Sequence, residues 1–232
     1  MNWKQFWEKQ SKHANLLQQV GRKGGLAQQP ESFLKEYAAY IANQLQLNKN
    51  DVLLDVCCGN GLLTHYLAKY CNSTLGLDFS EAHIEYAHKY YANETVQFMY
   101  ADALNLAQTA LERNFTKATL CFSFQYFETV QQGLQVMRGM VQHGVTHILI
   151  TDIPDRRRFF AYYNSPIKLL RLMKQMLLQQ NDMGKFWSAT ELNWITKQLD
   201  ANGTKIIQPD TFPYAHYRMD YLINTSEVKT LV

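Results

Sequence analysis

The sequence predicts an α/β fold: a doubly wound, mostly parallel seven-stranded sheet with helices on both faces, N-terminal helices and a helical insertion after the fifth strand. Short runs of branched and aromatic residues alternate with longer segments of helical periodicity, which is typical of a parallel sheet. Right-handed crossovers follow from that order. The 232 residues are 47% hydrophobic, which is enough for one large domain with a core of its own.

Two helical segments, near residues 3–19 and 32–45, precede the first predicted strand. Five strands are then expected over residues 52–56, 74–77, 96–100, 118–123 and 146–151. The helices between them are predicted near residues 61–70, 81–91, 106–112 and 129–142.

The segment 152–155 is expected to end the fifth strand, and an amphipathic helix over 166–178 follows, with Pro166 at a first helical position. Ser188 and Glu191 form a capping box for a further helix through about residue 199, and strands near 205–208 and 217–223 complete the sheet. On the helix over 166–178, one face holds Leu169, Leu170, Met173, Met176 and Leu177, and Lys168, Arg171 and Lys174 lean away from it.

Composition and charge exclude several classes of protein. A net charge of +3 is too small to favour nucleic acid as a partner. The N-terminus is charged and aromatic rather than a signal peptide, and no run of about 18 apolar residues predicts a membrane span. We therefore expect a cytoplasmic protein, monomer or homodimer, without a membrane or nucleic-acid partner.

The segment 55–61, with the sequence DVCCGNG, follows the first strand and admits three kinds of site: a thiol or metal site, a dinucleotide loop, or a cradle for another adenosine cofactor. The four cysteines lack the spacing of a zinc site, so no metal is expected. The dinucleotide fingerprint needs a third glycine, and Thr64 stands there instead. Asp55 would also repel a pyrophosphate, and it would favour a cationic or amino-bearing ligand.

Acidic residues end the next two strands as well, Asp78 after the second and Asp102 after the third. Ligands bind at the carboxyl edge of a doubly wound sheet, so we expect these side chains at one site. A carboxylate there can accept hydrogen bonds from both hydroxyls of a ribose, each worth roughly 1.5–3 kcal/mol. The three acids describe a pocket for a ribose, an amine and an adenine, without a phosphate.

With these residues the chain resembles the class I S-adenosylmethionine-dependent methyltransferases. The stretch from Leu54 to Gly61 is similar to their first motif, D-x-G-x-G-x-G, with Cys57 in place of the first glycine, and the resemblance covers about residues 51–152. It implies S-adenosylmethionine as the cofactor. It also implies a single domain, 1–232, with an N-terminal helical cover (1–47), a cofactor-binding core (48–152), a helical lid or insertion (153–187) and a C-terminal helix and strand pair (188–232).

The resemblance assigns a role to each matching residue. Asp55 would order the loop and the amino group of the methionine moiety, and Asp78 would hold the ribose hydroxyls. The other cofactor-binding residues implied are Cys57, Gly59, Asn60 and Gly61 of the loop, Phe79, Asp102 and Ala103 around the adenine, and Phe122 and Ser123 at the methionine part.

The methyl acceptor is predicted from what the chain lacks and from its C-terminal part. Residues 121–127 lack the Asn/Asp-Pro-Pro-Tyr segment of many enzymes that methylate bases, which favours a small molecule. The segment 213–221 resembles a Tyr-x-His-Tyr-Arg-x-Asp ending of methyltransferases encoded with bacterial surface-sugar pathways. His216 would then serve as a base or orienter, and Arg218 would anchor an acidic substrate.

Three further features stay open between a structural and a functional interpretation. Arg156, Arg157 and Arg158 are either a solvated turn or a lid for an anionic group. The aromatic residues near the N-terminus, Trp3, Phe6 and Trp7, would either cover the cofactor or pack on the sheet. Tyr126 would either face the acceptor or belong to the core.

The sequence therefore predicts an S-adenosylmethionine-dependent methyltransferase of a small polar molecule, with O-methylation of a sugar or related metabolite, anionic acceptors included, as the first expectation. Three alternatives remain: N-methylation of a small molecule, an NAD(P)-dependent reductase, and a binding module without catalysis. Positioning alone can lower a barrier by about 7–11 kcal/mol, so a methyltransferase need not display an obvious catalytic base.

Overall fold

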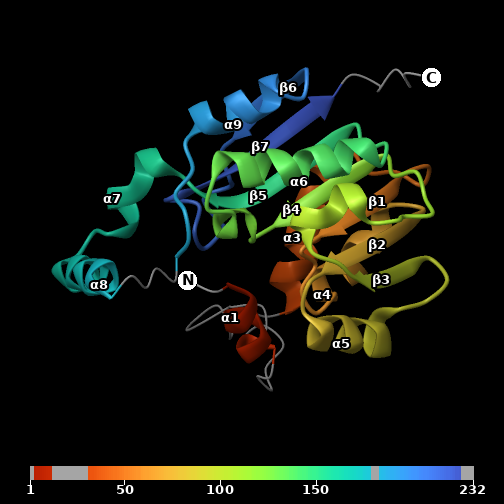
Figure 1. Cartoon of the computed structure of the whole chain (residues 1–232), viewed down its shortest axis with the longest axis horizontal. Coiled ribbons are helices and arrows are strands. Elements are labelled where there is room, and N and C mark those ends of the chain that lie inside the picture. Colours follow the sequence, from red (N-terminus) through yellow and green to blue (C-terminus); the bar gives the residue numbers. More distant parts are fainter. Residues whose placement is uncertain (1–2, 12–30, 179–182, 226–232) are drawn as a thin grey trace.

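A seven-stranded sheet in the order β3-β2-β1-β4-β5-β7-β6 forms the centre of the structure (Figure 1). The computed structural model describes residues 3–11, 31–178 and 183–225. The strands from β1 to β5 run parallel, and β7 is antiparallel to both β5 and β6, so the predicted fold class is confirmed. The strands are β1 (Val52–Val56), β2 (Ser73–Asp78), β3 (Val96–Tyr100), β4 (Lys117–Cys121), β5 (His147–Pro154), β6 (Ala201–Ile206) and β7 (Arg218–Thr225).

Helices cover both faces of the sheet. The largest buried cluster joins the sheet to α6 (Val130–Gln142), α9 (Ala189–Lys197) and the 3₁₀ helix η3 (Ala103–Gln108). On the opposite face, two clusters join it to α3 (Glu31–Leu45), α4 (Leu62–Leu67) and α5 (Glu81–Tyr91). The remaining elements are α1 (Trp3–Gln10), η2 (Ala68–Tyr70), η4 (Phe124–Tyr126), η5 (Arg156–Arg158), α7 (Phe159–Tyr162) and α8 (Pro166–Leu177).

Several helix ends follow directly from the local sequence. Ser80 caps α5, because its hydroxyl accepts a hydrogen bond from the His83 amide. Ser188 and Glu191 form the predicted capping box at the start of α9. Thr129 and Gln132 form a second capping box at α6. Such caps satisfy amide groups that have no partner within the helix.

The fifth strand does not end at Asp152, as the sequence had indicated, but continues to Pro154. The register with β7 shifts between Ile150 and Ile153, and Asp152 lies in this irregularity with φ 62°. Pairing then resumes, with Ile153 opposite Met219. A bulge of this kind lets a strand continue past a residue that does not fit the ladder.

Three other predicted elements differ from the structure in extent or type. The helix expected near 106–112 is the 3₁₀ helix η3, which begins earlier because the Asp102 carboxylate accepts from the Leu104 amide. The helix expected over 61–70 is divided into α4 and η2, and the strand expected near 205–208 is β6, four residues earlier at its start. The first helix is observed from Trp3 to Gln10, and its predicted continuation over 12–19 lies outside the described residues.

The chain leaves the sheet after β5 to form η5, α7 and α8, and it returns at α9 (Figure 1). This is the helical insertion that the sequence predicts. In Figure 1, α8 lies beyond the edge of the sheet, apart from the helices that cover its faces. Within the described residues, no helix combines the length and the apolar character that a membrane crossing needs.

Candidate functional site

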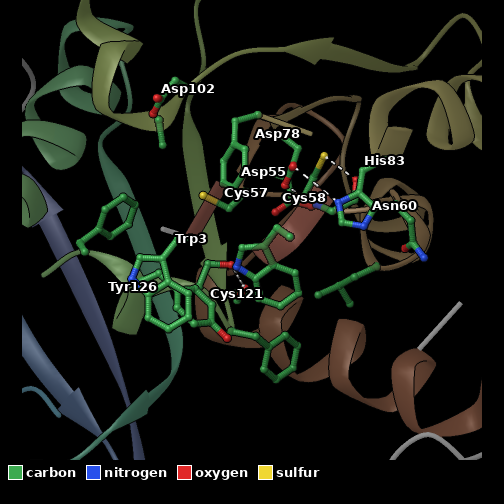
Figure 2. A pocket seen from close by; sticks show the side chains of 18 of the residues that line it. Trp3, Asp55, Cys57, Cys58, Asn60, Asp78, His83, Asp102, Cys121 and Tyr126 are labelled. Atoms are coloured by element: carbon green, nitrogen blue, oxygen red, sulfur yellow. Dashed lines mark hydrogen bonds and ion pairs between the residues drawn. The ribbon is translucent and has the colours of Figure 1, made fainter. Parts of the chain in front are cut away.

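A cavity of about 410 Å³ lies at the carboxyl ends of β1, β2 and β4 (Figure 2). The residues that follow these strands and β3 form its floor, and α1, α3 and the first turn of α4 add apolar side chains. Its position at the carboxyl edge, beside the point where the strand order reverses between β1 and β4, is the usual ligand site of a doubly wound sheet.

The loop after β1 takes an unusual backbone course. Cys57, Gly59 and Gly61 all have positive φ angles, of 60°, 57° and 78°. A side chain at Gly61 would also come within 2.8 Å of Ala87 Cβ, so two constraints require glycine there. Cys57 adopts the left-handed region without being glycine, at a strain of about 1–2 kcal/mol. The turn brings the backbone of the loop to the cavity wall.

Asp78 connects this loop to the second strand. Its carboxylate accepts hydrogen bonds from the Gly59 amide and from the Ser80 amide, both 2.9 Å long. The side chain is buried and lines the cavity, and the His83 ring lies beside it, with Nδ1 3.7 Å from Oδ1 (Figure 2). Two backbone bonds therefore fix the orientation of the Asp78 carboxylate.

Asp55 lies at the back of the cavity, near the carboxyl end of β1. It is 2% exposed, and its carboxylate accepts a 2.5 Å hydrogen bond from the hydroxyl of Thr64 on α4. Burial, together with the charge of Asp78, raises the pKa of Asp55 to about 7, against the lowering effect of the Thr64 hydrogen bond. A cationic ligand in the cavity would favour the ionised carboxylate.

Residues that follow β4 and β3 form another part of the cavity wall. Phe122 follows β4 with φ 58°, and its ring stacks on Tyr37 with a centroid distance of 4.8 Å. The hydroxyl of Ser123 donates to the Cys121 carbonyl. Opposite them, Ala103 follows the exposed Asp102, whose carboxylate caps η3 and also lines the cavity.

Aromatic residues of α1 form the outer wall. Trp3 and Trp7 both line the cavity and pack against Tyr126, with centroid distances of 4.5 and 5.3 Å (Figure 2). Of the two interpretations that the sequence left open, these contacts favour the one in which the N-terminal aromatic residues cover the cavity. Tyr126 likewise faces it.

The structure gathers the predicted cofactor residues around this cavity. Among them, Gly61 alone is not part of the wall; it precedes α4 and shapes the turn behind it. The residues that line the cavity as the sequence predicted are Asp55, Cys57, Gly59, Asn60, Asp78, Phe79, Asp102, Ala103, Phe122 and Ser123. Their contact with a cofactor stays a prediction.

The two predicted catalytic residues lie elsewhere. His216 is exposed and does not line the cavity. Its pKa is lowered by partial burial and by the positive charges of Lys168 and Arg158. Arg218 is buried, and its guanidinium forms an ion pair with Asp152, 3.1 Å away, and donates to the carbonyl of the same residue. A catalytic role for either residue stays a prediction.

The arginine triplet also stands outside the cavity wall. Arg156 pairs with Glu191 at 3.1 Å, and Arg158 donates to the carbonyl of Ala215 at 2.8 Å. These contacts attach η5 to α9 and to the segment before β7. They account for two of the three arginines structurally.

Sequence reasoning missed several wall residues. His83 is 2% exposed, and its ring nitrogens have no hydrogen-bond partner. His83 lies three residues after Ser80, the cap of α5, on the turn of the helix that faces the cavity. This position in the sequence could have identified it. Leu62, Leu63 and Gln132 reach the cavity through helix packing, for which the sequence pattern carries no distinct signal.

The surroundings of the thiols of Cys57 and Cys58 disfavour the reactive thiolate form. Burial raises the pKa values of Cys57 and Cys58, as do the nearby charges of Asp78 and Asp55. A protonated thiol is a poor nucleophile and a poor metal ligand. In the described part of the chain, no group of three or more His, Cys, Asp or Glu residues is arranged to hold a metal ion.

Residues 53–144 match the family model described as a methyltransferase domain. This segment contains β1 to β4, with every residue of the floor described above. The match identifies a methyltransferase domain over these residues. The family match stops before β5, so it leaves the insertion, α9 and the last two strands outside.

The chain is also similar to a known methyltransferase. It is 27% identical, over 161 residues, to a demethylmenaquinone methyltransferase of Lactobacillus johnsonii, and the match covers 66% of this chain. The chain spans 65% of the length of that enzyme.

Two solved structures share the fold. One is the N-methyltransferase NodS from Bradyrhizobium japonicum in complex with S-adenosylhomocysteine, with a TM-score of 0.64, 14% identity, and coverage of 98% of this chain and 100% of that one. The other is magnesium protoporphyrin IX methyltransferase from Synechocystis with S-adenosylhomocysteine bound, with a TM-score of 0.59, 16% identity, and coverage of 92% and 89%.

The chemistry of the cavity wall in the methyltransferase domain fits S-adenosylmethionine. Its wall carries the carboxylates of Asp55, Asp78 and Asp102 at three strand ends, and no Lys or Arg among the described residues that line it. Such a wall opposes a phosphate and suits a ribose and an ammonium group. The buried ring nitrogens of His83, which make no hydrogen bond, offer one more polar contact.

Proposed function

We propose that the whole chain transfers the methyl group of S-adenosylmethionine to an oxygen of a small, neutral molecule with a flat apolar face, such as a sugar or a related metabolite. The observation that carries the proposal is the composition of the cavity wall: aromatic rings on its outer side, carboxylates on its floor, and no Lys or Arg among its described residues. The N-terminal cover, the core, the insertion and the C-terminal pair would act as one domain.

Each floor residue would have a separate task toward the cofactor. Asp78, fixed by two backbone amides, would accept from the ribose hydroxyls, and Asp55 would attract the amino group. Asp102 and Ala103 would meet the adenine. When bound, the cofactor supplies an electrophilic methyl group on a positively charged sulfur.

The outer wall would hold the acceptor. Trp3, Trp7 and Tyr126 offer apolar ring faces, and Glu128 and Gln132 offer polar atoms at the same end. A hydroxyl-rich molecule with one apolar face would satisfy both. The absence of a basic side chain from the described wall argues against the anionic acceptors that the sequence analysis included.

N-methylation of an amine is the second candidate, and it rests on the same wall. Aromatic faces and carboxylates attract cationic groups, by about 0.5–2 kcal/mol for a cation over a ring. A methylated ammonium product would be held in this way.

The four cysteines are free, which suits the reducing cytoplasm that we propose as the location.

The cofactor is tested by isothermal titration with S-adenosylhomocysteine, with NADH and NADPH in parallel. We expect micromolar binding of the first, lost in Asp78→Ala and kept in the control Asp210→Ala, which changes an exposed loop carboxylate. Binding of a nicotinamide cofactor alone would replace the proposal with a reductase. An intact cofactor site without turnover on any acceptor would indicate a binding module.

The acceptor is tested by comparing matched neutral, amino and carboxylate forms of the same glycosides, with formation of S-adenosylhomocysteine as the readout. The proposal expects the neutral form to react fastest and the carboxylate form slowest. A preference for the amino form would establish the second candidate. A preference for the carboxylate form would contradict both.

A further inference from the structure

Helix α8 exposes an apolar stripe that the fold does not bury. Leu170, Met173 and Leu177 are 65%, 60% and 84% exposed, and Leu169 is 39% exposed. At 3.6 residues per turn these positions share one face of the helix, about 100° wide. A contiguous exposed apolar stripe is unusual on a monomeric protein and marks an interaction surface.

The opposite face explains how the helix is held. Leu172 packs in a cluster with Tyr163, Phe186 and Tyr217. Lys168 donates to the carbonyl of Tyr162, at 2.9 Å. The attached face of α8 is therefore turned toward the body of the protein, and the stripe is turned away from it. Figure 1 shows α8 at the periphery, beyond the edge of the sheet.

The charges on α8 are all of one sign. The sequence PIKLLRLMKQML contains Lys168, Arg171 and Lys174 and no acidic residue. Lys174 is exposed, beside the stripe. An apolar stripe on a helix whose charged residues are all basic is the pattern of a helix that lies in the surface of an anionic membrane.

We propose that α8 binds the surface of a bilayer that contains anionic lipids. The stripe from Leu169 to Leu177 would enter the boundary between head groups and acyl chains, and Lys174, which borders the stripe, would face the lipid phosphates. The helix has 12 residues, too few to cross a bilayer, so it would lie along the surface. The expectation of no membrane partner rested on the missing span, and a surface helix needs none.

Charge argues for a membrane rather than a second copy of the chain. A two-fold dimer through α8 would place the same face against itself. Lys174, which borders the stripe, would then approach its own copy, with no acidic residue of α8 to pair with it. Anionic lipid provides the complementary charge, at about 1 kcal/mol per basic residue near the surface.

The test is flotation of the full chain with two kinds of vesicle, phosphatidylcholine alone and phosphatidylcholine mixed with phosphatidylglycerol. We expect binding to the mixed vesicles that weakens in high salt. The double variant Leu170→Glu and Met173→Glu should bind at least about tenfold more weakly, since it removes apolar burial and adds like charge to the lipid. Lys174→Gln should weaken binding about fivefold.

Ile207→Glu is the matched control, because it places the same charge on an apolar residue that is 66% exposed away from α8. It should bind as the wild type does. Titration with S-adenosylhomocysteine shows that each variant is folded, since none of these residues lines the cavity.

Three results would overturn the proposal. The first is no binding to either kind of vesicle. The second is binding that the double variant leaves unchanged, which would place the contact elsewhere. The third is a homodimer in sedimentation that the double variant dissociates while vesicles are not bound, which would assign the stripe to a second copy of the chain.

Discussion

The hydroxyl of Thr64 and the carboxylate of Asp55 are joined by a 2.5 Å hydrogen bond, which ties the end of β1 to the first helical turn after the cofactor loop. Both residues are buried, Thr64 completely. The bond lowers the pKa of a carboxyl group that burial holds near 7. One contact thus stabilises the loop and sets the charge at the back of the cavity.

Thr64→Val removes this bond with little change of shape. We expect the free energy of unfolding to fall by about 1–3 kcal/mol, because the Asp55 carboxyl loses a buried partner. The pKa of Asp55 should rise further, so that less of it is ionised at neutral pH and S-adenosylhomocysteine binds more weakly. Urea unfolding and titration calorimetry measure the two effects.

Thr196→Val is the control for this pair, because the Thr196 hydroxyl makes a buried 2.8 Å bond to the Leu192 carbonyl in α9, away from the cavity. It should lower stability and leave cofactor affinity unchanged. Equal cofactor affinities in the two variants would mean that the Thr64 bond has no part in binding.

The pKa of Asp55 also predicts a pH dependence of stability. The value is about 7 in the folded chain and near 4 when unfolded, so the protonated form favours folding. Its contribution is complete below about pH 4 and is lost as the pH rises through 7. Thermal unfolding of Asp55→Asn without ligand should therefore lose less stability over this range than the wild type. Parallel curves for the two proteins would contradict the assignment.

Cofactor affinity should change with pH in the opposite direction. A bound ammonium group favours the ionised Asp55, so the affinity for S-adenosylhomocysteine should fall by up to about tenfold per unit as the pH drops below 7. Asp55→Asn should remove this dependence. An affinity that still falls below pH 7 in the variant would contradict the assignment of this dependence to Asp55.

Tyr126→Ala tests the outer wall. Its ring contacts Trp3 and Trp7, which would form the acceptor side of the cavity. We expect KM for the acceptor to rise about tenfold and the affinity for S-adenosylhomocysteine to change little. Tyr90→Ala, at an exposed tyrosine of α5 outside the cavity wall, should leave both unchanged. A change confined to cofactor affinity would assign Tyr126 to the cofactor.

His216→Ala and Arg218→Met separate catalysis from folding. A catalytic base contributes about 10²- to 10⁴-fold to turnover, but His216 is exposed outside the cavity wall, so we expect kcat near that of the wild type. Arg218→Met leaves the buried carboxylate of Asp152 without its ion pair and should cost about 3–5 kcal/mol of stability. A large fall in kcat for a stably folded His216→Ala variant would support the predicted role of His216 as a base.

The parts of the fold set by local signals were predicted correctly. The alternation of strand and helix, the capping box at Ser188 and the glycine loop all act within a few residues, so their patterns are visible in the sequence. The acidic residues at the strand ends were found for a similar reason, since parallel strands bring their carboxyl ends to one edge. The floor of the cavity was therefore predictable.

The features of the fold and the site that depend on contacts between distant segments were not predicted from the sequence. Arg218 looks like a substrate anchor in the sequence, and only the bulge in β5 brings Asp152 to it. The exposure of the α8 stripe was equally hidden. Its apolar periodicity is the same as that of a helix packed on a core, so the sequence predicts the face and not what covers it.

Among the described side chains of α8, Leu172 is the one that joins a hydrophobic cluster of the body. The remaining positions of this helix are thus under little constraint from the sheet or from the floor of the cavity. Substitutions there can accumulate, or be engineered, without disturbing the transfer of a methyl group. If both proposals hold, membrane contact through α8 and methyl transfer in the cavity would depend on separate sets of residues.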